Sequence, residues 1–564
     1  MRNLRTNVID TGQHKHHGVY LRSGLFRCTW WVVSIIFGIM PARGQIASTI
    51  PHLAKHGTAT QLMVHGTPFL MLGGELGNSS ASSLRYMAPV WPTLKTMGLN
   101  TILVPVSWEL LEPREGEFDF TLVDSLIQSA RENDLHVVLL WFGSWKNSMS
   151  CYAPAWVKMN QRRFPRARMS NGKALEILTP FSIENKNADI RAFSELMKHL
   201  RIMDGRQQTV VMVQVENEIG MIPEARDYCP EAENSFLQVV PAELMAYLKE
   251  HRMSLAKGFS QSWESAGGKM SGTWEEIFGK GVQTDEIFMA WQFARYANDV
   301  AAAGKKEFTL PMYVNAALMR PGSKPGQYPS AGPLPHLMEV WRAAAPQIDF
   351  LAPDIYFKNF SEWLGSYDRS GNPIFIPEAD QQQSLTNAFY AFARHNAMGY
   401  SPFSIESAAH PEGNQFSKGY DVLRQLTPLI LEHQGRGTMD GFLLDSVAQV
   451  ARVTLGKYIF TVKHEYSWPY ATRVEGQIPR YGGLIVQVAE DEYFIAGSGV
   501  VVTFQSSSDD GTSVGILRME EGTFVRGLWM PGRRMNGDQD HQGRHLNLPG
   551  GEFSIQKVKL YTYK

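Results

Sequence analysis

The chain has 564 residues, which is too long for one ordinary core and predicts either two domains or one large barrel with an appendage. Hydrophobic residues make up 44% of it, so a disordered protein is excluded. The net charge of -1 argues against nucleic acid or an anionic membrane surface as the main partner. Aromatic residues, 11% of the chain, suit either flat uncharged ligands or simply a large core.

Residues 1–44 are predicted to be a signal peptide. They combine a basic lead with the apolar stretch Trp30 to Met40 and the small-residue site Ala42-Arg43-Gly44. An uncleaved anchor or a later translation start stays open as an alternative. We therefore expect an exported protein, periplasmic or extracellular, with no membrane contact in its mature form.

Apolar runs alternate with amphipathic segments over the next three hundred residues. This alternation predicts an α/β fold, a (β/α)8 TIM barrel, as the catalytic domain over residues 45–412. The expected helices include Val123-Leu135, Ala192-Met203 and Leu337-Ala345. The expected strands are Phe69-Leu72, Thr101-Val106, Val137-Trp141, Val210-Val215, Met312-Val314, Phe350-Pro353, Ile374-Pro377 and Ser401-Ile405.

After the barrel, residues 413–436 are expected to form a linker helix and residues 437–564 an all-β sandwich. Period-two runs separated by Gly- and Asp-rich turns predict the strands Val447-Leu455, Lys457-Val462, Leu484-Val488, Tyr493-Ile495, Val500-Phe504 and Ser554-Tyr563. This domain either packs on the barrel, binds polysaccharide separately, or completes the pocket with Trp468 or Trp529.

Polar and aromatic residues follow every predicted barrel strand. In a parallel barrel the chemistry gathers at these carboxyl ends, so we expect the side chains to meet at one rim. In chain order they are Glu75; Trp108 and Glu109; Trp141, Trp145, Lys146 and Asn147; Glu216, Asn217 and Glu218; Asn315; Asp354 and Tyr356; Glu378 and Asp380; and Glu406.

Two of these acids suit the cleavage of a glycosidic bond. That reaction needs one carboxylic acid to protonate the leaving oxygen and one carboxylate to attack the anomeric carbon. Glu218 and Glu378 follow the fourth and seventh strands, which places them across the barrel mouth from each other. The sequence therefore predicts a glycoside hydrolase that needs neither a metal nor an organic cofactor.

Four blocks resemble glycoside hydrolase family 35, the retaining β-galactosidases of clan A. They are GGE (Gly73-Glu75), NTILVPVSWELLEPREGEFDF (Asn100-Phe120), VQVENEIG (Val213-Gly220) and PIFIPEAD (Pro373-Asp380). The resemblance covers Phe69 to about Glu406, and the β-domain resembles that of a bacterial branch of the family. The chain departs from the family at Leu76-Ser79 and at WFGSWKN, which touches sugar specificity more than the reaction.

The resemblance implies roles for individual residues. Glu218 corresponds to the acid/base, Glu378 to the nucleophile, Asn217 to the residue that binds the sugar 2-hydroxyl, and Tyr356 to the tyrosine that holds the nucleophile. Glu216 is expected to brace its neighbours. The expected substrate-binding set is Glu75, Trp108, Glu109, Trp141, Trp145, Asn217, Tyr356 and Glu406.

The predicted function is an exported retaining exo-β-galactosidase acting on oligosaccharides or polysaccharide fragments. The alternatives are another clan A activity, such as a β-glucosidase or β-mannosidase, and a sugar-binding barrel without catalysis. The sequence is compatible with a homodimer. It leaves open whether Cys151 and Cys229 pair or stay separate thiols.

Overall fold

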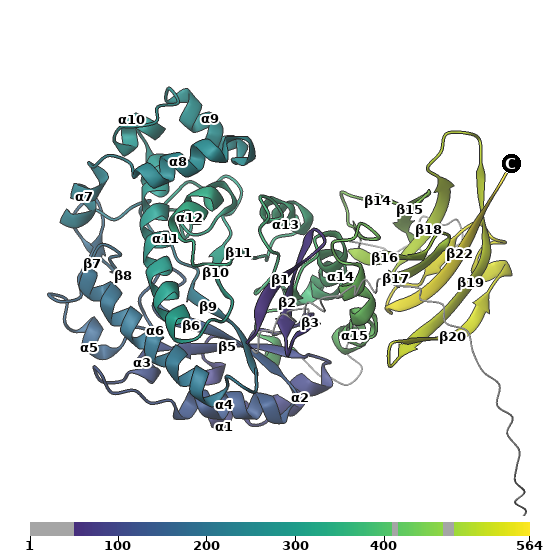
Figure 1. Ribbon diagram of the computed structural model, residues 1–564, viewed down its shortest axis with the longest axis horizontal. Coiled ribbons are helices and arrows are strands. Elements are labelled where there is room, and N and C mark those ends of the chain that lie inside the picture. Colours follow the sequence, from purple (N-terminus) through teal and green to yellow (C-terminus); the bar gives the residue numbers. More distant parts are fainter. Residues whose placement is uncertain (1–49, 409–414, 466–478) are drawn as a thin grey trace, which may run out of the picture. The chain divides into compact units, whose positions relative to one another are not determined.

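A closed barrel of parallel strands forms the first part of the chain (Figure 1). The computed structural model describes residues 50–408, 415–465 and 479–564; the predicted signal peptide and Trp468 lie outside them. Five neighbouring strands run in the order β11-β10-β9-β6-β5. They are β5 (Thr101–Ser107), β6 (His136–Lys146), β9 (Val210–Asn217), β10 (Met312–Ala317) and β11 (Phe350–Asp354).

Short segments close the barrel. Strand β4 (Met71–Leu72) pairs with β12 (Gly399–Tyr400), and Glu75 bridges to Leu103 of β5. On the other side, residues 374–379 join β11 through Ile355–Ala379 and β12 through Ile376–Tyr400. Segments at or next to all eight predicted strands contribute to the ring, and the (β/α)8 fold is confirmed. The eighth strand begins two residues before the predicted Ser401, so Glu406 lies in the following 3-10 turn.

Helices cover the outside of the ring. The expected segment Val123-Leu135 is α4, whose buried residues Val123, Leu126, Ile127 and Ala130 recur at three and four. Helix α6 packs against α11. The helices are α1 (Leu84–Met87), α2 (Val90–Thr96), α3 (Trp108–Leu111), α4 (Thr121–Glu132), α5 (Ala155–Lys158), α6 (Ile183–Met203), α7 (Pro230–Phe236), α8 (Ala242–Glu250), α9 (Lys257–Ser265), α10 (Trp274–Phe278), α11 (Val282–Glu307), α12 (Met338–Ala344), α13 (Phe360–Tyr367) and α14 (Ser384–Arg394).

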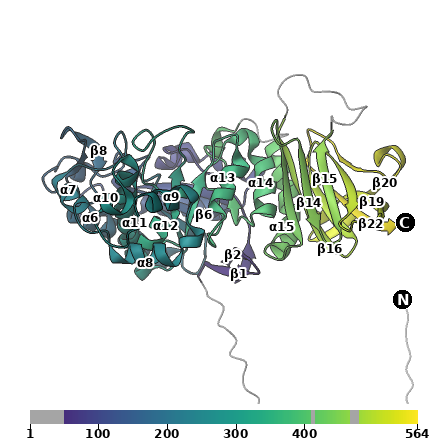
Figure 2. The same ribbon diagram turned by 90° about the horizontal axis from the view of Figure 1, so that it is seen from above.

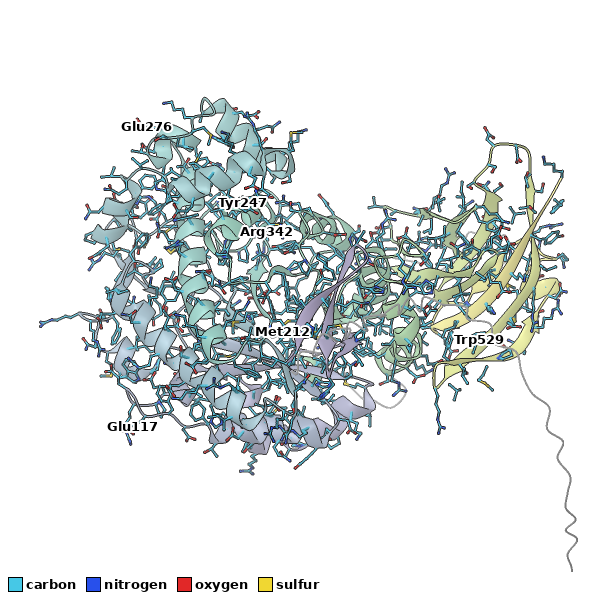
Figure 3. All side chains as sticks on the ribbon, viewed as in Figure 1. Glu117, Met212, Tyr247, Glu276, Arg342 and Trp529 are labelled. Atoms are coloured by element: carbon cyan, nitrogen blue, oxygen red, sulfur yellow. The ribbon has the colours of Figure 1, made fainter. Side chains whose placement is uncertain are left out.

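A three-stranded antiparallel sheet that the sequence analysis did not predict closes the N-terminal end of the barrel. It consists of β1 (His52–His56), β2 (Ala59–Val64) and β3 (Thr67–Phe69). Leu62 and Val64 join the same apolar cluster as the interior barrel residues, among them Met212, which is labelled in Figure 3. This end of the barrel is therefore packed and not open.

Helix α15 (Gln415–His433) follows the barrel and leads into two antiparallel sheets (Figure 2). Their facing side chains form a core of their own, which makes the predicted sandwich. One sheet has the order β13-β16-β17-β22-β19-β20 and the other β14-β15-β18-β21. The strands are β13 (Met439–Leu444), β14 (Val450–Leu455), β15 (Tyr458–His464), β16 (Tyr481–Ala489), β17 (Glu492–Gly497), β18 (Val500–Ser506), β19 (Ser513–Val525), β20 (Leu528–Met535), β21 (Leu546–Leu548) and β22 (Ser554–Tyr563).

The sandwich contacts the barrel through α14. This helix packs against β13 and β16, and Phe389 stacks on Phe553 with ring centroids 4.9 Å apart. Trp529 lies on β20, where its indole N–H donates to Glu520 and its ring packs on Phe494 and Phe524 (Figure 3). Trp529 therefore packs within its own domain. Among the described residues, no helix has both the length and the apolar character needed to cross a bilayer.

Candidate active site

Glu218 and Glu378 meet at the C-terminal end of the barrel. Glu218 directly follows β9, and Glu378 lies within residues 374–379, the stretch that joins β11 to β12. One carboxylate oxygen from each, together with one from Asp354 at the end of β11, lies within 4.8 Å of the other two. The backbone of Glu216 and of Glu218 is left-handed, with φ of 61° and 44°. This uncommon conformation turns the chain out of the strand at the point where Glu218 faces the mouth.

Two donors contact the buried carboxylate of Glu378. The Tyr356 hydroxyl donates to Oε2 over 2.8 Å, and the Asn217 amide donates to Oε1 over 3.4 Å. Almost half of Tyr356 is exposed, but its hydroxyl end lies against Glu378. Burial and the nearby Glu378 charge raise the pKa of Tyr356, so its hydroxyl stays protonated and donates. Both contacts stabilise a negative charge on Glu378.

Glu218 lies in a different environment. Its side chain is buried, its Oε2 accepts from the Asn147 amide, and its backbone N–H donates to Asn315 over 2.9 Å. Burial, followed by the charge of Glu378, raises the pKa of Glu218 to about 7, against a smaller opposing effect of Lys146. The two glutamates therefore differ in the way an acid and a nucleophile must differ.

Two further acids lie beside this pair. Glu75 is fully buried, and neither of its oxygens has a hydrogen-bond partner among the described residues. Burial and the Glu378 charge raise its pKa well above the usual range. The pKa of Asp354 is raised as well, by burial and then by Glu378 and Glu218. Burial and the mutual repulsion of these acids thus favour the protonated forms of Glu75 and Asp354.

Glu216 points away from the mouth. Its Oε2 accepts the Trp145 backbone N–H over 2.8 Å, and burial with the nearby Asp189 raises its pKa well above the usual range. The expected bracing role fits these contacts. Gly143 is required beside it, because a Cβ there would lie 2.8 Å from Glu216 Oε1 and 2.2 Å from the Trp141 indole nitrogen.

The three tryptophans expected to bind substrate do not face the mouth, which corrects that part of the prediction. Trp141 donates to Asp189 on α6, and Trp145 packs against Phe293 and Tyr296 on α11. Trp108 donates to Glu112 on the neighbouring turn. All three are fully buried in the layer between barrel and helices. Strand alternation explains Trp141, since it places Phe142 inside the barrel and Trp141 outside.

Glu109 and Glu406 also make contacts other than the expected ones. Glu109, on α3, forms a partly exposed ion pair with Lys158 at 3.3 Å and lines a cavity of about 260 Å³ that none of Glu218, Glu378 and Asn217 lines. Glu406 accepts from the Gly77 backbone and the Ser80 hydroxyl, so it fastens the turn after β12 to the loop after β4. In the described structure Glu109 is a surface ion-pair residue and Glu406 a loop anchor.

Three residues at the site were not assigned a role from the sequence. Asp354 has an oxygen within 4.8 Å of Glu218 and Glu378, Asn147 contacts Glu218, and the buried Lys146 acts to lower the pKa of Glu218 and of Glu75. All three stand at predicted strand ends. Each is a polar side chain at a strand end, and this polarity is the signal that could have singled them out over Trp141 and Trp145.

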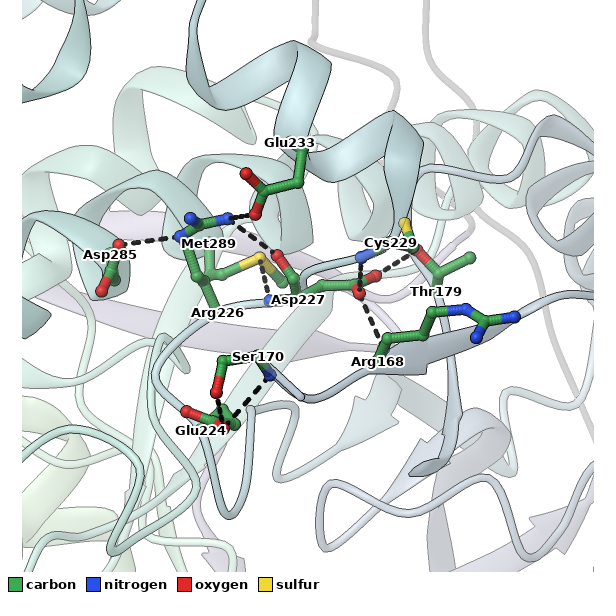
Figure 4. Close-up of polar contacts among 10 residues, drawn as sticks. All are labelled: Arg168, Ser170, Thr179, Glu224, Arg226, Asp227, Cys229, Glu233, Asp285 and Met289. Atoms are coloured by element: carbon green, nitrogen blue, oxygen red, sulfur yellow. Dashed lines mark hydrogen bonds and ion pairs between the residues drawn. The ribbon is translucent and has the colours of Figure 1, made fainter. Parts of the chain in front are cut away.

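The loop after β9 is fixed by a buried polar cluster (Figure 4). Asp227 is fully buried and accepts from the Arg168 backbone, the Cys229 backbone and the Thr179 hydroxyl. Arg226 pairs with Asp285 and Glu233 at 2.9 and 2.6 Å. Cys151 and Cys229 are both free thiols, so the pairing left open by the sequence is not present. The cluster holds the segment that directly follows Glu218.

Two family models match separate parts of the chain. A glycoside hydrolase model, Glyco_hydro_42, described as beta-galactosidase, matches residues 90–279, which include Glu218. A domain of unknown function, DUF5597, matches residues 416–547. Human beta-galactosidase-1-like protein 3 is 27% identical over 191 residues, which is 32% of this chain and 26% of that protein. The chain thus aligns with only about a quarter of that relative.

Solved structures of similar shape include the β-galactosidases of Bacillus circulans sp. alkalophilus and of Rahnella sp. R3. The first is 14% identical, with a TM-score of 0.45, and covers 64% of this chain and 57% of its own. The second is 16% identical, with a TM-score of 0.43 and the same coverage. The barrel assignment rests on the strand order given above. The sequence matches support a galactosidase-like glycoside hydrolase of clan A, and they do not single out family 35.

Proposed function

We propose that the protein is an exported retaining exo-β-galactosidase that removes terminal β-D-galactose from oligosaccharides or polysaccharide fragments. The galactoside preference rests on the beta-galactosidase family match and on the family 35-like block Asn100-Phe120. Export rests on the signal-like residues 1–44.

One observation carries the proposal: the carboxylate oxygens of Glu218 and Glu378 approach within 4.8 Å in contrasting environments. Retaining enzymes need carboxyl groups roughly 5 to 5.5 Å apart, whereas inverting enzymes leave about 6.5 to 9.5 Å for a water molecule. The short approach favours direct attack by Glu378.

The proposed reaction has two steps. In the first step Glu378 bonds to the anomeric carbon while the proton of Glu218 passes to the departing glycosidic oxygen, which keeps the electron pair of the broken bond. The negative charge on Glu378 is consumed, so the main charge that raises the pKa of Glu218 disappears. In the second step Glu218 takes a proton from water, and the hydroxide formed displaces Glu378 from the sugar.

Turnover of p-nitrophenyl β-galactoside, β-glucoside and β-mannoside tests the substrate class. We expect the galactoside to be preferred by at least about tenfold in kcat/KM. Preference for another sugar would replace the galactosidase by a different clan A activity. Proton NMR of the first product tests the mechanism, because release of β-galactose before mutarotation is expected and release of the α-anomer would exclude retention.

A further inference from the structure

The proposed mechanism leaves one acid at its centre unused. Asp354 is buried, ends β11 and has a carboxyl oxygen within 4.8 Å of an oxygen of Glu218 and of Glu378. We propose that Asp354 is a positioning residue that stays protonated and donates a hydrogen bond to Glu218, stabilising the Glu218 carboxylate each time it forms. This inference rests on the proposed function and deepens it, because it names what sets the acid strength of Glu218.

Asn315 fixes the orientation of Asp354. Its amide nitrogen donates to Asp354 Oδ2 over 2.7 Å, while its amide oxygen accepts the Glu218 backbone N–H over 2.9 Å. One asparagine thus ties both acids to β10. Oδ2 accepts from Asn315, and Oδ1 is a buried oxygen with no hydrogen-bond partner among the described residues. Oδ1 is therefore the oxygen free to face Glu218.

One carboxyl oxygen of Asp354 and one of Glu218 lie within 4.8 Å of each other, and we place a hydrogen bond between them. Such a contact requires one carboxyl group to carry a proton. Burial, followed by the charges of Glu378 and Glu218, raises the pKa of Asp354 well above the usual range, which favours Asp354 as the donor and Glu218 as the acceptor. A protonated buried carboxyl group that serves as a donor is a known way to stabilise a nearby negative charge.

The surrounding charges agree with this assignment. Glu378 is the strongest anionic neighbour of both acids and disfavours a second negative charge beside it, whereas Lys146 favours ionisation of Glu218. The other titratable groups facing Asp354 come from the first-strand loop, β10, the turn after β11 and α13; they are Glu75, Tyr313, Tyr356 and Tyr367. With Glu378 ionised, the protonated form of Asp354 is the favoured one.

Asp354 gives up no proton in the reaction. When Glu218 protonates the leaving oxygen it becomes an anion, and the hydrogen bond from Asp354 strengthens because its acceptor is now charged. The hydrogen bond from Asp354 should therefore accelerate the reaction most for leaving groups that need full protonation. It should have little effect with dinitrophenolate, which leaves without being protonated. Loss of the donor should also make Glu218 a weaker acid.

The experiment compares wild type with Asp354→Asn and Asp354→Leu on dinitrophenyl and methyl β-galactosides. Asparagine can still accept from Asn315 and donate to Glu218, whereas leucine is branched at the same carbon, Cγ, and has no donor. We expect Asp354→Leu to lower kcat/KM on the methyl galactoside at least about tenfold more than on the dinitrophenyl galactoside, and Asp354→Asn to keep the wild-type ratio within about threefold. The ratio of two substrates in one variant is independent of the folded fraction.

Two outcomes would overturn the proposal. If Asp354→Leu lowers kcat/KM equally on both substrates, the role of Asp354 is structural. If Asp354→Asn changes the ratio of the two kcat/KM values as much as Asp354→Leu does, the charge of Asp354 matters and its donated proton does not. A second readout needs no turnover: carbon-13 NMR titration of Glu218 in glutamate-labelled protein, assigned with Glu218→Gln. The Glu218 pKa should rise in Asp354→Leu and stay near wild type in Asp354→Asn. An unchanged pKa in the leucine variant contradicts the proposal, whereas an inactive wild type contradicts only the proposed function.

Discussion

The two ends of the barrel treat a buried acid in opposite ways. At the closed end, Asp204 pairs with Arg131 at 2.8 Å and accepts the Val210 backbone N–H at 2.7 Å. At the mouth, Glu75 is equally buried and has neither an ion pair nor a hydrogen bond among the described residues. A buried carboxyl group without partners costs stability, and a paired one much less. The closed end is therefore built for stability and the mouth for chemistry.

The largest effect is expected at the mouth. Glu378→Ala should lower turnover by more than about 10⁴-fold, as removal of a covalent nucleophile does. Azide should restore activity by attacking from the vacated side and yield α-galactosyl azide, identified by NMR. Gln382→Ala, four residues along on an exposed turn, is the matched control and should keep wild-type turnover. Near wild-type activity in Glu378→Ala would remove it from the nucleophile role and blur the distinction between the two ends.

At the closed end the same kind of truncation should act on stability alone. Leu62 is fully buried between the small N-terminal sheet and the barrel interior, so Leu62→Ala should lower the free energy of unfolding by about 2 to 5 kcal/mol. Urea unfolding measures this loss. The kcat/KM of the folded protein should change less than about twofold. A large change in kcat/KM would mean that the closed end also shapes the site.

Replacing an acid at the mouth should increase stability above neutral pH. The pKa of Glu218 is raised to about 7 in the folded protein, above its ordinary value of 4.5, so the folded state binds more protons and stability falls as pH rises through this window. Glu218→Gln removes this loss. We expect its stability relative to wild type to grow by roughly 1 to 3 kcal/mol between pH 4.5 and 7.5. Parallel pH profiles from urea unfolding would contradict the raised pKa.

The smallest effect is expected for Glu109, which belongs neither to the acids at the barrel mouth nor to the residues at the closed end. Its partly exposed ion pair with Lys158 contributes little, so Glu109→Gln should change stability by less than about 1 kcal/mol. Because Glu109 contacts neither Glu218 nor Glu378, kcat/KM should also stay within about twofold of wild type. A loss of tenfold or more, seen in KM, would return Glu109 to the substrate-binding set proposed from the sequence.

Prediction from sequence located a side chain correctly where its residue type fits only one kind of environment at that position. Glu218 and Glu378 follow apolar strands, and acids at such positions seldom occur without a use, so their convergence followed from the barrel alone. The tryptophans failed because an aromatic residue fits both a sugar platform and a helix-packed core. Along β6, successive side chains alternate between the barrel interior and the helix layer, so the interior Phe142 places Trp141 in the helix layer. The pairing of β6 with β9 is irregular between Trp141 and Lys146, so the same alternation cannot be used to place Trp145.

Other features were hidden for different physical reasons. The β1–β3 sheet is short and rich in His, Lys and Thr, so its pattern does not stand out until it is packed on the barrel. Strands β19 and β20 carry charged residues on exposed faces and were not recognised. The role of Asp354 depends on the amide of Asn315, a contact between neighbouring strands that no local pattern reveals.

The left-handed backbone at Glu218 also limits which replacements the position accepts. At φ of 44°, glycine and asparagine adopt the local conformation more readily than alanine or a β-branched residue. In a library randomised at this position and selected only for resistance to proteolysis, glycine and asparagine should therefore be enriched over alanine and valine. Glutamate occupies this position although its backbone conformation favours glycine or asparagine. Selection for activity and selection for folding would therefore favour different amino acids at position 218.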